Sequence, residues 1–443
     1  MSSRHYACAV VGDWHLAFVT AACLADLGHR TVMVSPGGER PDGHEDSFPA
    51  PPVLEPGLPE MIARAQAAGT LHHASGIAGH WSADVVWLAI DTPVDSHDEP
   101  DVAPLLSAAR AIAHHRCCRA VFVVTSQVPV GFCDALEDET GLTVACVPEN
   151  LRLGSGIESF LRADRKVVGA RTPGAAATVA RLLEGVRADL VTCDLATAEM
   201  IKHATNAFLA TSISFANELA RLGETAGADG HDVARALKLD RRIGPRAYVE
   251  PGLGFAGGTL PRDLRVLQRR GRQHRVPTPL VDAVLEVNAA TASALLEAID
   301  AYVGGVEGRT VLVLGYTYKA DTDTLRRSPS LDLARVLRER KARVLGFDPS
   351  MNARDLSELH GLIEHRAAWS DVGEMPDAVV VMTPRREFAE LAWSSLRRPA
   401  RDRPPLVLDA RGALGSEAVL RAGCAYKALW RPVKMPAAKA AGQ

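Results

Sequence analysis

The sequence lacks the features that mark several large classes of protein. Its formal net charge is −3 over 443 residues, so no basic excess points to nucleic acid as a partner. It contains no run of about 20 apolar residues that could span a bilayer, and its N-terminus has no charged-then-apolar signal region. We therefore expect a cytoplasmic protein with neither a nucleic-acid nor a membrane partner.

Metal-binding patterns are also missing. The eight cysteines form no C-x-x-C pair, which favours buried reduced thiols over zinc ligands or disulfides. The histidines are scattered, and the adjacent His72 and His73 would point apart on a regular element. We expect no metal site.

What the sequence does contain begins with a strand-helix-strand unit. Apolar runs at residues 6–11 and 31–34 flank an amphipathic stretch. In the dinucleotide-binding version of this unit, three glycines allow the tight turn and an acid after the second strand binds the ribose. Gly12 is present, but Trp14 occupies the second glycine position and Ser35 stands where the acid belongs. This motif alone favours a structural role over a cofactor site.

Further apolar runs continue the pattern of a parallel sheet. Residues 85–90 lead into Thr92, and residues 120–126 end at Ser126, which places both hydroxyls where a cofactor lies in doubly wound sheets. Residues 310–347 repeat the strand-helix-strand pattern. The expected fold is α/β, with two Rossmann-like doubly wound parallel-sheet domains joined by a central helical domain.

The central region is organised around one long helix. From Ala196 to Gly223 the apolar residues follow a helical period. Such a helix spans about 40 Å at its rise of about 1.5 Å per residue, which predicts that it ties two domains together. Lys202 and Asn206 lie four residues apart, on one side of this helix. By itself such a pair usually marks a solvated helix face.

A loop rich in glycine interrupts two helical segments further along the chain. Residues 252–263 read Gly-Leu-Gly-Phe-Ala-Gly-Gly-Thr-Leu-Pro-Arg-Asp. This loop resembles the active-site loop of the UDP-glucose/GDP-mannose dehydrogenase family, Gly-Phe-Gly-Gly-Ser-Cys-Phe-Pro-Lys-Asp, with Thr259 at the position of the nucleophilic cysteine. Three other stretches, which begin at Glu55, Glu149 and Glu199, also match family motifs in order, and the resemblance covers about residues 6–432.

The resemblance implies three domains and a set of site residues. The domains are a dinucleotide-binding domain at 1–195, a helical dimerisation domain at 196–302 and a nucleotide-sugar-binding domain at 303–432, and the Ala- and Lys-rich composition of residues 433–443 predicts a disordered tail. The implied catalytic residues are Lys202, Asn206, Asp263, Thr259 and Glu149. The implied cofactor-binding residues are Gly12, Trp14, Ser35, Arg40, Thr92, Ser126 and Arg326. The implied substrate-binding residues are Arg242, Tyr248, Gly254, Phe255, Lys319 and Arg411.

The resemblance also implies the cofactor and the partners. NAD is the family's cofactor, while Ser35 removes a charge that would repel a 2′-phosphate and Arg40 lies where the family often places an adenosine-side arginine, so NADP stays open. The substrate is a nucleotide sugar. The chain is expected to form a homodimer through its central helix.

The chemistry that we expect differs from that of the family. Family members oxidise a primary alcohol twice through a cysteine thioester, whereas Thr259 offers only a hydroxyl. Gln127 also replaces a threonine thought to organise water. We predict oxidation of a UDP-, GDP- or TDP-sugar by one two-electron step to a ketone or aldehyde, in antibiotic biosynthesis such as that of a lincosamide-type octose.

Two other functions remain open at this point. The first is a catalytically inactive homologue that only binds nucleotide sugar, which the degraded glycine turn and the missing nucleophile favour. The second is a redox-neutral epimerase that oxidises its substrate and then returns the hydride. The retained Lys202, Asn206 and Asp263 argue against the first.

Overall fold

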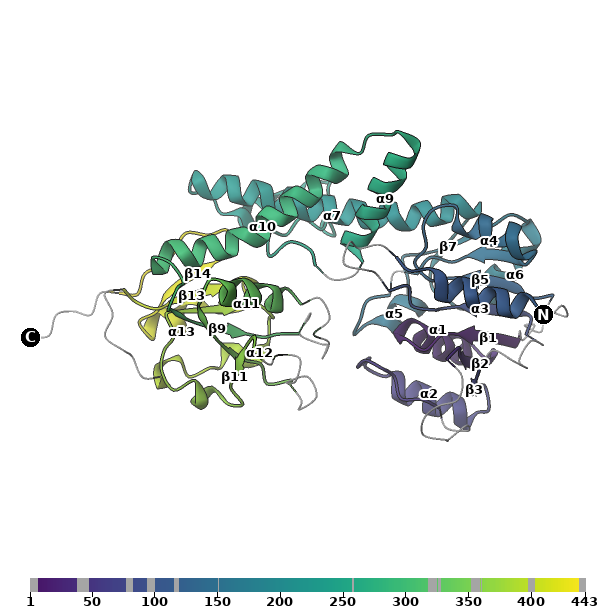
Figure 1. The fold of residues 1–443 in the computed structure, drawn as a ribbon, viewed down its shortest axis with the longest axis horizontal. Coiled ribbons are helices and arrows are strands. Elements are labelled where there is room, and N and C mark those ends of the chain that lie inside the picture. Colours follow the sequence, from purple (N-terminus) through teal and green to yellow (C-terminus); the bar gives the residue numbers. More distant parts are fainter. Residues whose placement is uncertain are drawn as a thin grey trace, which may run out of the picture. The chain divides into compact units, whose positions relative to one another are not determined.

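The structure is a computed structural model of the chain. It describes residues 7–37, 48–76, 83–93, 100–114, 119–149, 151–256, 259–317, 325, 328–351, 359, 361–396 and 403–437. The chain divides into two compact units, Met1–Thr205 and Asn206–Gln443, and each contains a sheet of its own (Figure 1).

The N-terminal unit is built on an eight-stranded sheet in the order β3-β2-β1-β4-β5-β6-β7-β8. Its strands are β1 (Ala7–Val11), β2 (Arg30–Ser35), β3 (Leu71–Ser75), β4 (Val85–Leu88), β5 (Val121–Val124), β6 (Thr143–Cys146), β7 (Arg165–Ala170) and β8 (Asp189–Cys193). All neighbouring strands are parallel except β6 and β7, which are antiparallel. The first six strands therefore have the order of a doubly wound dinucleotide fold.

Helices cover both faces of this sheet. One face packs against α1 (His15–Asp26), α2 (Leu58–Ala67), α5 (Gly156–Leu161) and α6 (Pro173–Leu182). The other packs against α3 (Ala103–Ala113) and α4 (Phe132–Thr140). Because both faces are covered, β1, β4 and β5 are almost wholly buried, which explains their continuous apolar sequences.

The C-terminal unit contains a six-stranded parallel sheet in the order β11-β10-β9-β12-β13-β14. Its strands are β9 (Thr310–Leu314), β10 (Arg343–Phe347), β11 (Glu364–His365), β12 (Ala378–Val381), β13 (Leu406–Asp409) and β14 (Ala425–Ala428). One face packs against α11 (Pro329–Glu339) and the end of α10 (Pro279–Val303). The other face packs against α12 (Arg386–Ala389), α13 (Ser416–Arg421) and the short 3-10 helices Trp369–Val372 and Trp393–Ser395.

Helices occupy the middle of the chain, as the sequence predicts. They are α7 (Leu195–Thr225), α8 (Gly230–Leu239), α9 (Leu260–His274) and α10. The expectation of one long helix is confirmed by α7, which has 31 residues. In the C-terminal unit, α9 and α10 lie side by side (Figure 1) and share a small core with α7 around Phe255 and Leu264.

The sequence was expected to contain no segment that could span a bilayer, and α10 is the helix that tests this expectation. By length and composition alone α10 could cross a membrane, with a mean hydropathy of 1.3 in its most apolar window. The core helix of a globular protein passes the same test. In this structure Val284 and Ile299 of α10 are buried among other helices and strands.

Candidate active site

The turn between β1 and α1 requires glycine at its first position. Gly12 has a φ of +154°, and a Cβ atom there would lie 2.3 Å from the carbonyl oxygen of Ala89 and 2.9 Å from the Cβ of Ala17. The backbone therefore passes close to β4 and brings the first turn of α1 to the end of the sheet. Trp14, at the second glycine position, is half-buried and precedes the first residue of α1. Free N–H groups at such a helix start favour a phosphate.

Three polar side chains lie at the carboxyl ends of the neighbouring strands. The hydroxyl of Thr92 donates to the carbonyl oxygen of Gln127 at 2.9 Å, and that of Ser126 donates to the carbonyl oxygen of Ile90 at 2.6 Å. Both therefore tie together the loops that follow β4 and β5. Ser35, at the end of β2, lies 3.0 Å from Nε2 of His73.

Glu55 fixes the loop that carries Glu149, a contact that no local pattern in the sequence indicates. Glu55 is 2% exposed and accepts hydrogen bonds from the backbone N–H groups of Gly154 and Gly156, at 3.0 and 2.7 Å. Nε2 of His15, at the start of α1, lies 2.8 Å from the same carboxylate. One buried acid thus joins the cofactor turn to a loop about 100 residues further along the chain.

Lys202 and Glu149 lie together in the N-terminal unit. The ammonium of Lys202 donates to the backbone oxygen of Glu149 at 2.6 Å. The carboxylate of Glu149 accepts a hydrogen bond from Lys166 of β7 at 2.5 Å, and both of these side chains are buried. Burial raises the pKa of Glu149, and the positive charges of Lys166 and Lys202 oppose that rise. No pattern in the sequence singled out Lys166.

A small hollow opens beside Lys202. Its lining residues are Thr125, Ser126, Gln127, Val128, Cys146, Pro148, Glu199 and Lys202. Glu199 accepts hydrogen bonds from the backbone N–H groups of Gly131 and Cys133 at the start of α4, at 2.5 and 2.7 Å. Burial raises the pKa of Glu199 despite these bonds. The hollow therefore contains one lysine ammonium and one acid already engaged by backbone amides.

The other predicted catalytic residues lie in the C-terminal unit. Asn206, one turn after Lys202 on α7, donates through its amide to Asp263, and both side chains are buried. Asp263 belongs to the first turn of α9. Thr259 immediately precedes α9, is exposed, and makes no capping hydrogen bond through its side chain. The structure thus pairs Asn206 with Asp263 at the start of the helix that Thr259 begins.

Asn288 of α10 holds the glycine-rich loop. Its amide contacts both backbone groups of Phe255, since Oδ1 accepts from the N–H at 2.8 Å and Nδ2 donates to the carbonyl at 2.9 Å. Gly254 has a φ of +79°, and a Cβ atom there would lie 2.5 Å from Oδ1 of Asn288. This clamp, which the sequence did not reveal, requires glycine at 254.

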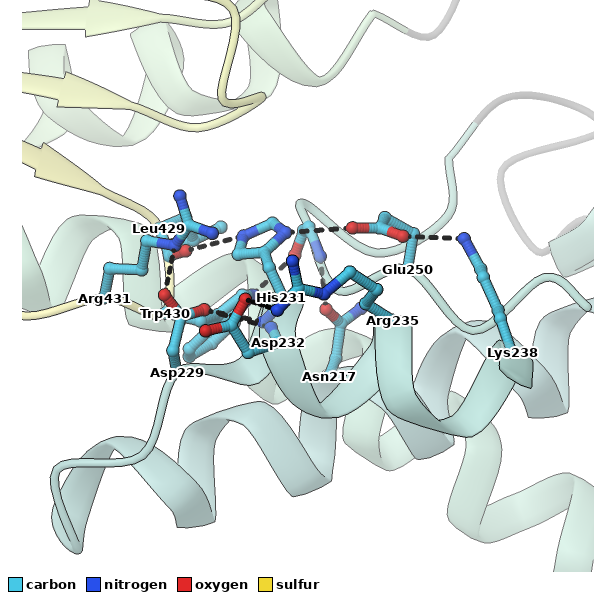
Figure 2. A network of polar contacts seen from close by, with 11 residues as sticks. Asn217, Asp229, His231, Asp232, Arg235, Lys238, Glu250, Leu429, Trp430 and Arg431 are labelled. Atoms are coloured by element: carbon cyan, nitrogen blue, oxygen red, sulfur yellow. Dashed lines mark hydrogen bonds and ion pairs between the residues drawn. The ribbon is translucent and has the colours of Figure 1, made fainter. Parts of the chain in front are cut away.

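A polar network anchors the start of the same loop (Figure 2). Asn217 of α7 accepts from the N–H of Gly252 at 2.7 Å, and the indole of Trp430 donates to the Gly252 carbonyl at 3.1 Å. Glu250 accepts from Lys238 at 2.7 Å and contacts Nδ1 of His231 at 3.0 Å, and both partners come from α8. The loop is therefore held by α7, α8 and the segment after β14.

Of the predicted substrate-binding residues outside the glycine-rich loop, two are exposed and one is hydrogen-bonded at the end of a strand. Arg242 is exposed and pairs with Asp240 at 2.7 Å, and Tyr248 is 55% exposed. Arg411 follows β13 and donates to the carbonyl oxygen of Met382 at 3.3 Å. The remaining predicted residues, Arg40, Lys319 and Arg326, lie outside the described residues.

Comparison with known proteins decides the family. Three family models match in order: the UDP-glucose/GDP-mannose dehydrogenase family NAD binding domain at residues 6–186, its central domain at 196–290 and its UDP binding domain at 312–416. A UDP-glucose 6-dehydrogenase from Rhizobium meliloti (strain 1021) is 35% identical over 96% of this chain and 99% of its own. The chain belongs to the UDP-glucose/GDP-mannose dehydrogenase family.

Other relatives agree with this assignment. A UDP-glucose 6-dehydrogenase from Pseudomonas aeruginosa is 31% identical over 96% of this chain and 97% of its own. The structure of a UDP-glucose dehydrogenase from the archaeon Pyrobaculum islandicum matches with a TM-score of 0.87 and 30% identity, over 97% of this chain and 99% of the other. This member of the family is thus an NAD-dependent nucleotide-sugar dehydrogenase, and the predictions of fold, enzyme class and cofactor are confirmed.

The residues at the β1–α1 turn fit NAD. The turn at Gly12 suits this group, because a side chain there would collide with the carbonyl oxygen of Ala89 and because the turn leads directly into α1. Backbone N–H groups at a helix start favour a pyrophosphate. Gly12, Thr92 and Ser126 would hold the cofactor, which supplies a hydride acceptor when bound. Trp14 is the departure from the usual glycine pattern.

Proposed function

We propose that the chain oxidises one hydroxyl of a nucleotide-activated sugar by a single two-electron step and releases a ketone or aldehyde. The observation that carries this proposal is Thr259. A threonine hydroxyl acts as a nucleophile only when a base lies beside it. The described residues include no base that is hydrogen-bonded to Thr259, and residues 252–263 contain no cysteine.

The oxidation half of the chemistry has the groups that it needs. We assign Lys202 and Asn206 to the reacting oxygen, because an ammonium and an amide N–H stabilise the negative charge that develops as the hydroxyl loses its proton. Asp263 accepts a hydrogen bond from Asn206 and so orients that amide. Lys202, Asn206 and Asp263 together support proton removal and charge stabilisation, and neither requires a thiol.

A secondary alcohol as the substrate accounts best for the loss of the thiol. Oxidation of a secondary alcohol gives a ketone, which has no second hydride to lose and cannot become a thioester. An extended sugar such as the octose of lincosamide-type antibiotics offers such a hydroxyl, and we propose a cytoplasmic role in a pathway of this kind. Arg242, Tyr248, Arg411 and Lys319 are the proposed contacts to its diphosphate and nucleoside.

We further propose that the chain is a homodimer that associates through α7. Along α7, Phe208, Phe215, Leu219 and Leu222 are spaced at helical intervals and are 70%, 48%, 37% and 66% exposed. Large apolar side chains gathered on one stripe of a helix favour a protein partner. A second copy of α7 offers the same stripe, as a two-fold interface requires.

A screen for substrate tests the proposed function. The purified protein is incubated with NAD and a panel of UDP-, GDP- and TDP-sugars that includes extended-chain sugars, and absorbance of the reduced nicotinamide is followed. We expect reduction of NAD with a sugar that carries a free secondary hydroxyl. An inactive homologue would bind a sugar nucleotide without any absorbance change, and an epimerase would change the sugar without net reduction.

A further inference from the structure

Lys166 is a lysine buried inside a sheet. It lies in β7, its side chain is 4% exposed, and the following residues Val167 and Val168 are buried apolar side chains. Its ammonium is 2.5 Å from Oε1 of Glu149 and 4.1 Å from the centroid of the Phe160 ring. An ammonium is stable in such a place only when a counter-charge compensates for its lost hydration. Lys166 is therefore committed to Glu149.

This pair lies directly beside Lys202. Lys202 donates to the backbone oxygen of Glu149, while Lys166 donates to the carboxylate of the same residue. Lys202 is the other cation whose charge acts on the buried carboxylate of Glu149. Without Lys166, Lys202 would therefore be the counter-charge of that carboxylate, and opposite charges at short distance favour each other's ionised form. Together Lys166 and Glu149 carry no net charge, whichever of the two holds the proton.

We propose that Lys166 is a positioning residue that occupies the carboxylate of Glu149 and thereby leaves the charge of Lys202 to the reacting oxygen of the substrate. This inference rests on the role of Lys202 proposed above. With Lys166 present, the three groups carry a net charge of one positive unit, which favours an alkoxide. Glu149 then acts neither as a base toward substrate nor as the counter-ion of Lys202.

The other acids near this site are already bound to other partners. Glu199, which lines the hollow with Lys202, is engaged by the backbone amides of α4. Glu55 is engaged by His15 and by two backbone amides. The nearby thiols include Cys146, which lines the hollow, and Cys133, whose backbone N–H donates to Glu199. Cys23 of α1 is a third, and burial strongly raises its pKa.

The test is a pH titration of Lys202 by NMR, with the chain labelled at the ε-carbon of its eight lysines. The proteins are wild type, Lys166→Met, and Lys166→Met with Glu149→Gln. In Lys166→Met the pKa of Lys202 should rise by about one unit or more, a tenfold change, because a positive neighbour is lost and a carboxylate is freed. In the double variant, where both charges are absent, the pKa should return to the wild-type value. The matched control is Lys341→Met, an exposed lysine paired with Glu307.

Two results would overturn the inference. One is a Lys202 pKa that is the same in Lys166→Met as in wild type, and the other is a double variant that keeps the raised value. If Lys166→Met does not fold, Glu149→Gln serves instead, and the unpaired Lys166 charge should lower the pKa of Lys202. A merely structural role of Lys166 would change the melting temperature and leave these titrations unmoved. No substrate is used, so the outcome is independent of whether the proposed single oxidation is correct.

Discussion

The hydroxyl of Thr259 and the ammonium of Lys202 belong to different stages of the family's chemistry. Thr259 is exposed at the start of α9 without a capping hydrogen bond, whereas Lys202 is fixed by the backbone of Glu149. Elsewhere, five of the six cysteines among the described residues are buried, and burial together with Asp84 raises the pKa of one of them, Cys8, to about 12. The residues that we propose to stabilise an alkoxide are therefore kept, while a cysteine is missing from the glycine-rich loop.

Replacement of Lys202 by alanine should affect turnover more than binding. Its charge matters most when the oxygen becomes negative, so we expect kcat to fall by about 100-fold or more, while the dissociation constant for the sugar nucleotide changes less than about tenfold. Steady-state kinetics and calorimetry measure the two quantities. Lys341→Ala is the control, and equal losses in kcat and in affinity would contradict the assigned role.

Replacement of Gly254 should destabilise the protein, whereas replacement of the nearby Gly252 should not. Gly254→Ala would place a Cβ atom 2.5 Å from Asn288 at a positive φ, so we expect a loss of about 1–3 kcal/mol of stability. Gly252→Ala, in the same loop, meets no atom within 4 Å and should change stability by less than about 0.5 kcal/mol. Thermal unfolding of both variants checks the prediction, which equal effects would contradict.

At the scale of elements, the strands with continuous apolar sequences were predictable and the others were not. The strand-helix-strand pattern expected at residues 310–347 is confirmed and ends in β10, because a strand covered on both faces has a continuous apolar sequence. β8 is largely exposed, β11 has two residues, and β7 contains Lys166 within its buried run. The apolar signal of all three is weak or broken.

The polar network around the loop makes a prediction about pH. Burial alone would raise the pKa of Glu250, but hydrogen bonds from Lys238 and His231 outweigh it and lower that pKa. A carboxyl with a lowered folded-state pKa stabilises the folded form above its unfolded value, about 4.5, and loses this effect as the pH falls through the lower value. The anchoring of residues 248–255 should thus weaken below about pH 4.5.

Hydrogen exchange of that segment measures the effect. We expect its protection factors to be constant from about pH 7 to pH 5 and to fall below about pH 4.5. In Glu250→Gln they should already be lower at neutral pH and should depend less on acid. Glu307→Gln, which removes an exposed pair with Lys341, is the control. Equal acid dependence in Glu250→Gln and wild type would contradict this account.

At the scale of the whole molecule, the fold followed from the order of apolar runs, whereas the contacts that build the site did not. Two strand-helix-strand patterns around a long helix were visible in the sequence, and α7 confirms the helix between them. The bonds from Glu55 to Gly154 and from Asn288 to Phe255 join residues far apart in the chain. Such partners depend on strand order and helix packing, which no local pattern specifies.

Association of two chains is tested on the exposed stripe of α7. We expect the wild-type chain to sediment as the proposed dimer and Phe208→Asp combined with Phe215→Asp to sediment as a monomer in analytical ultracentrifugation, because the charges would be buried at a self-complementary interface. The control is Leu190→Asp on the edge strand β8, where an apolar residue is 47% exposed. If the double variant remained a dimer and Leu190→Asp became a monomer, the interface would not lie on α7.

The number of nicotinamides reduced per sugar consumed tests the central claim most directly. A site without a thiolate removes one hydride, so the ratio should be one, with a ketone or aldehyde as the product identified by mass spectrometry. Thr259→Cys should leave the ratio at one if the oxidised carbon is secondary, since a ketone has no second hydride to give. A ratio of two in the wild-type protein, with a uronic acid as the product, would contradict the account.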